Sequence, residues 1–172
     1  MELVPGRECG NCTACCTHLR IEDDELKKLA GEPCPHLSNH QGCSIYATRP
    51  ITCRNWYCGW RYMSQLDDQC RPDQSGIMIR LKDDGLIFEP IDSPLSLNAE
   101  WVIGIIGAGI EDTDLSMYIS VPTKQGFTHA LVRLNERFAE AVASRNGYAV
   151  QKEMLEAIVF GMKSETDPVC SS

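Results

Sequence analysis

Residues 9–16 read CGNCTACC, and residues 42–58 read GCSIYATRPITCRNWYC. The first stretch holds four of the ten cysteines, and eight of the ten lie within the first 58 residues. A C-x-x-C turn lets two thiolates approach one metal ion, and two such turns overlap in residues 9–16. This concentration of thiols at one end predicts an N-terminal region organised around metal ions.

The number of early cysteines suggests two sites, because one tetrahedral metal ion takes four ligands. Cys15 and Cys16 are adjacent, and neighbouring side chains diverge by about 100° on a helix or point to opposite faces of a strand. We therefore expect these two thiolates to serve different ions, or different iron atoms of one cluster. Soft thiolate ligands select zinc, copper(I) or iron–sulfur clusters. Zinc ions are the leading prediction, with iron or an iron–sulfur cluster as the alternative.

Three motifs together resemble the YkgJ-like cysteine cluster family, which is described as a zinc- or iron-chelating domain. They are CGNCTACC, CPHL at residues 34–37 and GCSIYATRPITCR at residues 42–54, so the resemblance spans about residues 9–60. The resemblance implies metal ligation by Cys9, Cys12, Cys15, Cys16, Cys34, Cys43 and Cys53. Cys58 is our eighth candidate ligand, and Cys70 is the alternative for that place.

Composition and charge narrow the classes of partner. The net charge of −8 argues against binding to a phosphate backbone, and so no nucleic-acid partner is expected. The longest apolar segment, WVIGIIGAGI, has only ten residues, and no membrane partner is expected either. The start, MELVPGREC, lacks the apolar stretch of a secretory signal. These features predict a cytoplasmic protein with reduced thiols, which disfavours a disulfide scaffold. Metal ions are the expected partners, and a protein partner stays unidentified.

The sequence pattern predicts an α+β fold in two regions. Residues 1–72 are expected to form a loop-rich, cysteine-cluster metal-binding head, and residues 73–172 a small mixed α+β body packed on it. Two short helices are expected in the head, at residues 21–31 and 48–60. The body is expected to contain a hairpin at 75–92 turning at Asp84-Gly85, a buried helix at 98–111, a strand at 115–122, and helices at 131–147 and 150–163.

Several residues outside the cysteine set also have expected roles. Arg49 and Arg54 lie where they could donate hydrogen bonds to thiolates or to inorganic sulfide. The histidines near the cysteines, His18, His36 and His40, are weaker ligand candidates because thiolates already suffice. Cys170 lies in a polar tail and is expected to bind no metal.

The leading functional hypothesis is a cytoplasmic metal-binding protein that holds zinc or iron. The alternative is a redox protein or enzyme with an iron–sulfur or thiolate-iron centre and an unknown substrate. Both hypotheses leave open whether the chain is an enzyme.

Overall fold

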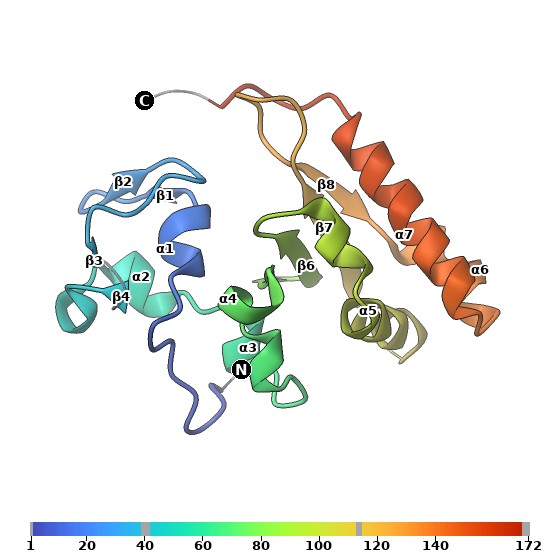
Figure 1. Cartoon of the computed structure of the whole chain (residues 1–172), viewed down its shortest axis with the longest axis horizontal. Coiled ribbons are helices and arrows are strands. Elements are labelled where there is room, and N and C mark those ends of the chain that lie inside the picture. The colour runs from blue at the N-terminus through green and yellow to red at the C-terminus, as the bar shows by residue number, and fades with distance from the viewer. Residues whose placement is uncertain (1, 39–41, 113–114, 170–172) are drawn as a thin grey trace. The chain divides into compact units, whose positions relative to one another are not determined.

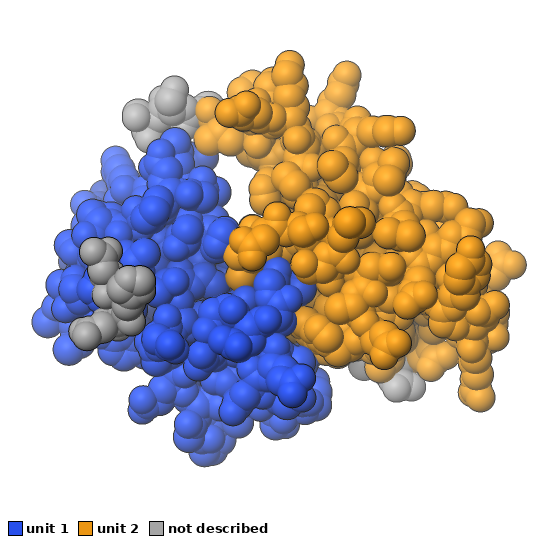
Figure 2. All heavy atoms as spheres, in the orientation of Figure 1, with its two compact units in different colours: residues 1–78 blue, residues 79–172 orange. Residues whose placement is uncertain are grey.

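The computed structural model describes residues 2–38, 42–112 and 115–169, and it divides the chain into two compact units. Unit 1 is Met1–Met78 and unit 2 is Ile79–Ser172 (Figure 2). Helices and strands are both present, which confirms the mixed α+β class (Figure 1). Among the described residues, none of the helices combines the length and the apolar character that crossing a membrane requires.

Unit 1 is made of short elements joined by loops. They are α1 (Ala14–His18), β1 (Ile21–Glu22), β2 (Lys27–Lys28), β3 (Leu37–Ser38), β4 (Gly42–Cys43), η1 (Tyr46–Thr48), α2 (Ile51–Asn55), α3 (Gly59–Tyr62), η2 (Asp68–Cys70) and α4 (Pro72–Ser75). The longest of them has five residues. Elements this short cannot be stable alone, so their positions depend on tertiary contacts.

The predicted helix at residues 21–31 is wrong. The segment forms the antiparallel pair β1–β2, in which Ile21 lies opposite Lys28. Asp23 makes the turn between the two strands, because its carboxylate accepts a hydrogen bond from the Glu25 amide at 3.0 Å. Its backbone also exchanges hydrogen bonds with Leu26. An aspartate that bonds the backbone locally competes with helix formation, and here that competition decides the structure.

The predicted helix at residues 48–60 is interrupted. Helix α2 ends at Asn55, and Trp56 and Cys58 have extended backbone conformations before α3 begins at Gly59. Cys58 therefore lies at the N-cap of α3 rather than on a continuous helix with Cys53. The shared face that a single helix would have given Cys53 and Trp60 does not form.

Unit 2 contains a four-stranded sheet with helices (Figure 1). Its elements are β5 (Ile77–Lys82), whose first two residues belong to unit 1, β6 (Gly85–Pro90), η3 (Pro94–Asn98), α5 (Glu100–Asp112), β7 (Ser116–Val121), β8 (Ala130–Arg133), α6 (Asn135–Ala143) and α7 (Gly147–Met162). The strand order is β5-β6-β7-β8. Strands β6 and β7 are parallel, with α5 in the crossover between them, and β7 and β8 are antiparallel.

The predicted hairpin at residues 75–92 is confirmed as β5 and β6, but its turn lies at residues 83–84, one residue earlier than the predicted Asp84-Gly85 turn. Gly85 begins β6 and lies opposite Ser116 of β7. A Cβ atom at Gly85 would lie 1.8 Å from the Ser116 carbonyl oxygen. Glycine is therefore required here by the close approach of a parallel strand.

The predicted helix at residues 131–147 starts later than expected, because residues 130–133 form β8. Ala130 and Val132 are buried while Leu131 and Arg133 are exposed, which is the alternation of a strand. Asn135 then begins α6, and its side-chain oxygen accepts a hydrogen bond from the Met117 amide at 2.8 Å. The unit has a substantial apolar core that includes the fully buried residues Phe88, Val102, Ile106, Ile119, Val121, Leu134, Phe138 and Met154.

Candidate metal centre

The cysteines of unit 1 come from loops and short elements that contact one another. The Cys12 amide donates to the Cys9 carbonyl at 2.9 Å, which closes the first C-x-x-C turn. This turn lies against β4, because a Cβ atom at Gly42 would be 2.9 Å from the Gly10 carbonyl oxygen. Gly42 also has a φ of +80°, a conformation that favours glycine. The first cysteine turn and the strand that carries Cys43 are therefore close neighbours.

Four thiols form one electrostatic neighbourhood. The Cys34 amide donates to the Cys16 carbonyl at 2.9 Å, and Leu37, three residues after Cys34, lies opposite Cys43 in the β3–β4 pair. Burial raises the pKa of Cys53, and the charges of Cys16, Cys34 and Cys43 raise that pKa further. Cys16, Cys34, Cys43 and Cys53 are called set B below.

A second set of thiols lies around the first cysteine turn. The pKa of Cys15 is raised first by its hydrogen bond with Cys16 and by burial, and then by the charges of Cys16, Cys9 and Cys12. Burial raises the pKa of Cys58, and the charge of Cys9 adds to the increase. Cys9, Cys12, Cys15 and Cys58 are called set A below.

Cys15 and Cys16 are adjacent on α1 and connect the two sets. Their thiols share a hydrogen bond, which lowers the pKa of Cys16 to about 7 and raises the pKa of Cys15. The charges of Lys28 and Arg49 also favour the Cys16 thiolate. In set A, burial raises the pKa of Cys12 to about 11. Set B thus contains a thiol whose pKa is lowered, and set A contains thiols whose pKa is raised.

The thiols of each set interact, yet their arrangement is not that of a closed metal site. The nine cysteines in the described part of the chain are free. In the same residues, no three side chains of His, Cys, Asp or Glu are arranged so that they could hold a metal ion. With Zn–S bonds of about 2.3 Å, tetrahedral ligation needs sulfur atoms about 3.8 Å apart. Metal ligation by either set therefore requires the sulfur atoms to move closer together.

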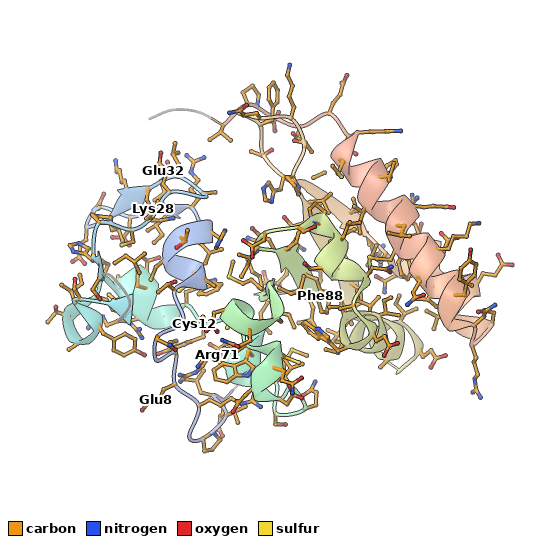
Figure 3. The ribbon with its side chains drawn as sticks, viewed as in Figure 1. Glu8, Cys12, Lys28, Glu32, Arg71 and Phe88 are labelled. Carbon is orange, nitrogen blue, oxygen red and sulfur yellow. The ribbon has the colours of Figure 1, made fainter. Side chains whose placement is uncertain are left out.

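Lys28, labelled in Figure 3, is a buried cation whose charged neighbours include Cys34 and Cys16 of set B, and sequence analysis did not predict it. Its Nζ donates to the carbonyl oxygens of Thr17 at 3.2 Å and Leu29 at 3.0 Å, and also to that of Leu19. Burial lowers the pKa of Lys28, and the negative groups that oppose this effect most are Cys34 and Cys16. The ammonium group joins β2 to the end of α1, next to the thiols.

Two arginines flank the ring of Tyr57, at 5.9 Å for Arg49 and 5.2 Å for Arg61. Arg49 also lies 4.0 Å from the ring of Tyr46. In the described part of the chain, Arg49 Nε and Arg61 Nε and Nη1 are buried without a hydrogen-bond partner. Arg61, which is only 8% exposed, was missed by sequence analysis. Arg54, which was expected to contact thiolates, is exposed.

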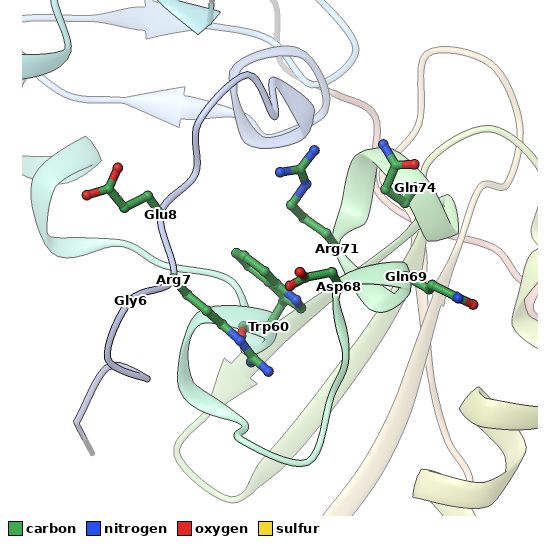
Figure 4. A pocket seen from close by; sticks show the side chains of 8 residues that line it. All are labelled: Gly6, Arg7, Glu8, Trp60, Asp68, Gln69, Arg71 and Gln74. Atoms are coloured by element: carbon green, nitrogen blue, oxygen red, sulfur yellow. The ribbon is translucent and has the colours of Figure 1, made fainter.

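An open pocket of about 630 Å³ lies in unit 1 (Figure 4). It is lined by Gly6, Arg7, Glu8, Trp60, Asp68, Gln69, Arg71 and Gln74. Its two cations are already engaged. Arg7 donates to the carbonyl oxygens of Trp60 and Met63, and Arg71 forms an ion pair of 2.6 Å with Asp73. Both cations of the pocket therefore already have hydrogen-bond or ion-pair partners within the chain.

Among the remaining candidates, His18 is the last residue of α1 and His36 lies two residues after Cys34. Burial raises the pKa of Cys70, and its strongest charged neighbour is Asp67, which also hydrogen-bonds to it. Cys58, in contrast, has Cys9 among its neighbours. His40 and Cys170 lie outside the described residues.

No protein-family model, no curated protein and no solved structure matches the chain. The resemblance to the YkgJ-like family therefore stays a prediction that rests on the motifs of residues 9–60 alone.

Proposed function

We propose that unit 1 binds two metal ions, each through four cysteine thiolates, in a cytoplasmic protein. Set A (Cys9, Cys12, Cys15 and Cys58) holds one ion, and set B (Cys16, Cys34, Cys43 and Cys53) holds the other. The observation that carries the proposal is the division of eight thiols into two neighbourhoods of four, with the adjacent Cys15 and Cys16 in different ones. Zinc is the first candidate because its structural sites take four ligands, often all thiolates.

The cations near the thiols give further support. A divalent ion with four thiolates carries a net charge of −2, and such a charge is costly to bury unless positive groups lie nearby. Lys28 and Arg49 are neighbours of Cys16, and Arg49 is also a neighbour of Cys9. The negative charge of a filled site would also stabilise these two cations in return.

An iron–sulfur or thiolate-iron redox centre is the second candidate. It is favoured by the buried N–H groups of Arg49 and Arg61 that have no acceptor in the described part of the chain. Inorganic sulfide and thiolate sulfur are both hydrogen-bond acceptors, and hydrogen bonds to sulfur tune the reduction potential of such centres.

Metal analysis of the full chain, purified without oxygen, tests the proposal. We expect two zinc ions per chain and a colourless protein. Broad absorption near about 400 nm with stoichiometric iron would favour the second candidate. A protein that contains neither metal, and takes up neither after reduction, contradicts both.

Paired substitutions test the division into sets. Cys16→Ser with Cys53→Ser should lose one ion, because both changes fall in set B. Cys15→Ser with Cys16→Ser should lose both ions, because the changes fall in different sets. Cys70→Ser is the control and should keep both. The division is wrong if the first two double variants lose the same amount of metal.

A further inference from the structure

Helix α7 carries a line of exposed apolar side chains. Tyr148 is 76% exposed, Leu155 41%, Val159 48% and Met162 48%. The opposite side of the helix is buried and also apolar, through Val150, Met154, Ala157, Ile158 and Gly161. A helix that is apolar on both sides usually has both sides covered. The described chain covers only one side of α7, so the exposed line is a candidate interaction surface.

Three residues of the line are spaced symmetrically, whereas the residue that the same symmetry relates to Val159 is Gln151. Tyr148 and Met162 each lie seven residues, about two helical turns, from Leu155. If a second copy packs antiparallel about a twofold axis at Leu155, the two Leu155 side chains meet. Tyr148 of each copy then faces Met162 of the other, and contacts between a thioether and an aromatic ring are favourable. The same surface is therefore complementary to itself, as a twofold interface requires.

Charges beside the line fit the same arrangement. Lys152 and Glu156 form an ion pair of 3.5 Å along one edge of it. With a twofold axis at Leu155, the Lys152–Glu156 edges of the two copies lie on the same side of the helix pair. It brings Lys152 of one copy to within about 3 Å, along the helix axis, of the level of Glu156 in the other. Two reciprocal ion pairs then lie along this edge of the apolar contact.

We propose that α7 is a self-association surface through which two copies of this chain pair antiparallel. The helix has 16 residues and is about 24 Å long, so one helix pair buries less than the roughly 1,200 Å² of standard complexes. We expect a weak dimer with a dissociation constant of about 10–100 μM. The pairing uses only residues of unit 2 and does not depend on metal binding.

Sedimentation of the full chain over a range of concentrations tests the pairing. The wild-type protein should change from monomer to dimer, and Leu155→Glu should weaken the dimer by at least about tenfold because it places two carboxylates on the axis. Leu95→Glu is the matched control, since Leu95 is 65% exposed and lies on η3. It should dimerise as the wild type does.

Charge reversal tests the twofold geometry without changing the apolar line. Lys152→Glu and Glu156→Lys should each weaken the dimer, and the double variant should restore it. Circular dichroism of every variant separates dissociation from unfolding. The proposal is overturned if the wild type stays monomeric at millimolar concentration, if folded Leu155→Glu dimerises normally, or if the double reversal restores nothing.

Discussion

Lys28 illustrates how one residue can link the fold of unit 1 to its thiols. Its ammonium group donates to the carbonyl oxygens of Thr17, Leu19 and Leu29, and the charges that favour the ammonium form most are those of Cys34 and Cys16. Methionine at this position would keep most of the apolar stem but would leave the three carbonyl groups without this donor.

Lys28→Met should therefore lower the free energy of unfolding by about 1–3 kcal/mol. It should also weaken metal binding to set B, which loses its compensating charge. Urea denaturation and competition with a chelator measure the two effects. Lys27→Met is the control, because Lys27 lies on the same strand but is exposed. Equal behaviour of the two variants would show that the buried ammonium has no such role.

Substitution of Arg61 is expected to change the stability of the metal-free and the metal-loaded protein in different directions. Its buried Nε and Nη1 lack acceptors in the described part of the chain, so Arg61→Met should leave the metal-free protein equally stable or more stable. If thiolates of a filled site accept from these groups, the same change should destabilise the metal-loaded protein by about 1–3 kcal/mol. Thermal unfolding of both forms, with Arg54→Met as the exposed control, measures the difference. A shift of the same sign and size in both forms would exclude a role for Arg61 at the thiols.

At the scale of the elements, the close contact between β6 and β7 requires glycine at position 85. Gly85→Ala would place a methyl group 1.8 Å from the Ser116 carbonyl oxygen, so the strands would have to separate. We expect a loss of about 1–3 kcal/mol in the free energy of unfolding, as for other overpacked sites. Gly104→Ala on α5 is the control, because a Cβ atom there meets nothing within 4 Å. Alanine should stabilise that helix by up to about 1 kcal/mol. Similar urea midpoints for the two variants would contradict the steric argument.

The elements also show what sequence patterns could predict. The hairpin at β5–β6 and the helices α5 and α7 follow from local turn chemistry and periodicity, and they were predicted within a few residues. The strands β1, β2 and β8 were mistaken for helix because each is very short and exists only through its partner strand. The partner of β8 is β7, which ends nine residues before β8 begins. The pairing of β1 with β2 depends on the turn made by Asp23.

For the candidate site, the sequence likewise predicted some features and missed others. Spacing identified the cysteines and placed Cys15 and Cys16 in different roles, which remains a prediction. Spacing could not assign Cys34 and Cys43 to the neighbourhood of Cys16, because a backbone hydrogen bond between Cys34 and Cys16 and the β3–β4 pair bring them there. The cations at Lys28 and Arg61 were missed since nothing local distinguishes a buried lysine or arginine from an exposed one.

At the scale of the whole molecule, the two units differ in what can stabilise them. Unit 1 has elements of at most five residues, whereas unit 2 has longer helices around a large apolar core. Thiolate-bound zinc can contribute on the order of 10 kcal/mol to the folding of a small domain. Metal removal should therefore unfold residues 9–60 while unit 2 keeps its structure.

Hydrogen exchange measured by mass spectrometry checks this expectation. After chelation under reducing conditions, amides of residues 9–60 should exchange rapidly, and those of β6, β7 and α7 should stay protected. Residues that hold no metal, such as those of α5, provide the internal control. Unchanged protection of residues 9–60 after complete metal removal would contradict the dependence.

The peptide bond between Cys15 and Cys16 has a consequence for the order in which the proposed sites fill. One turn of α1 carries a thiol of each set, so an ion bound at either set fixes the helix that presents the other thiol. The first ion to bind lowers the conformational entropy of that turn, and the second ion does not have to lower it again. Binding of the two ions should then be positively cooperative, and chains carrying a single ion should stay scarce during titration. Native mass spectrometry would count the three species, and a large half-filled population would mean that the two sites fill independently.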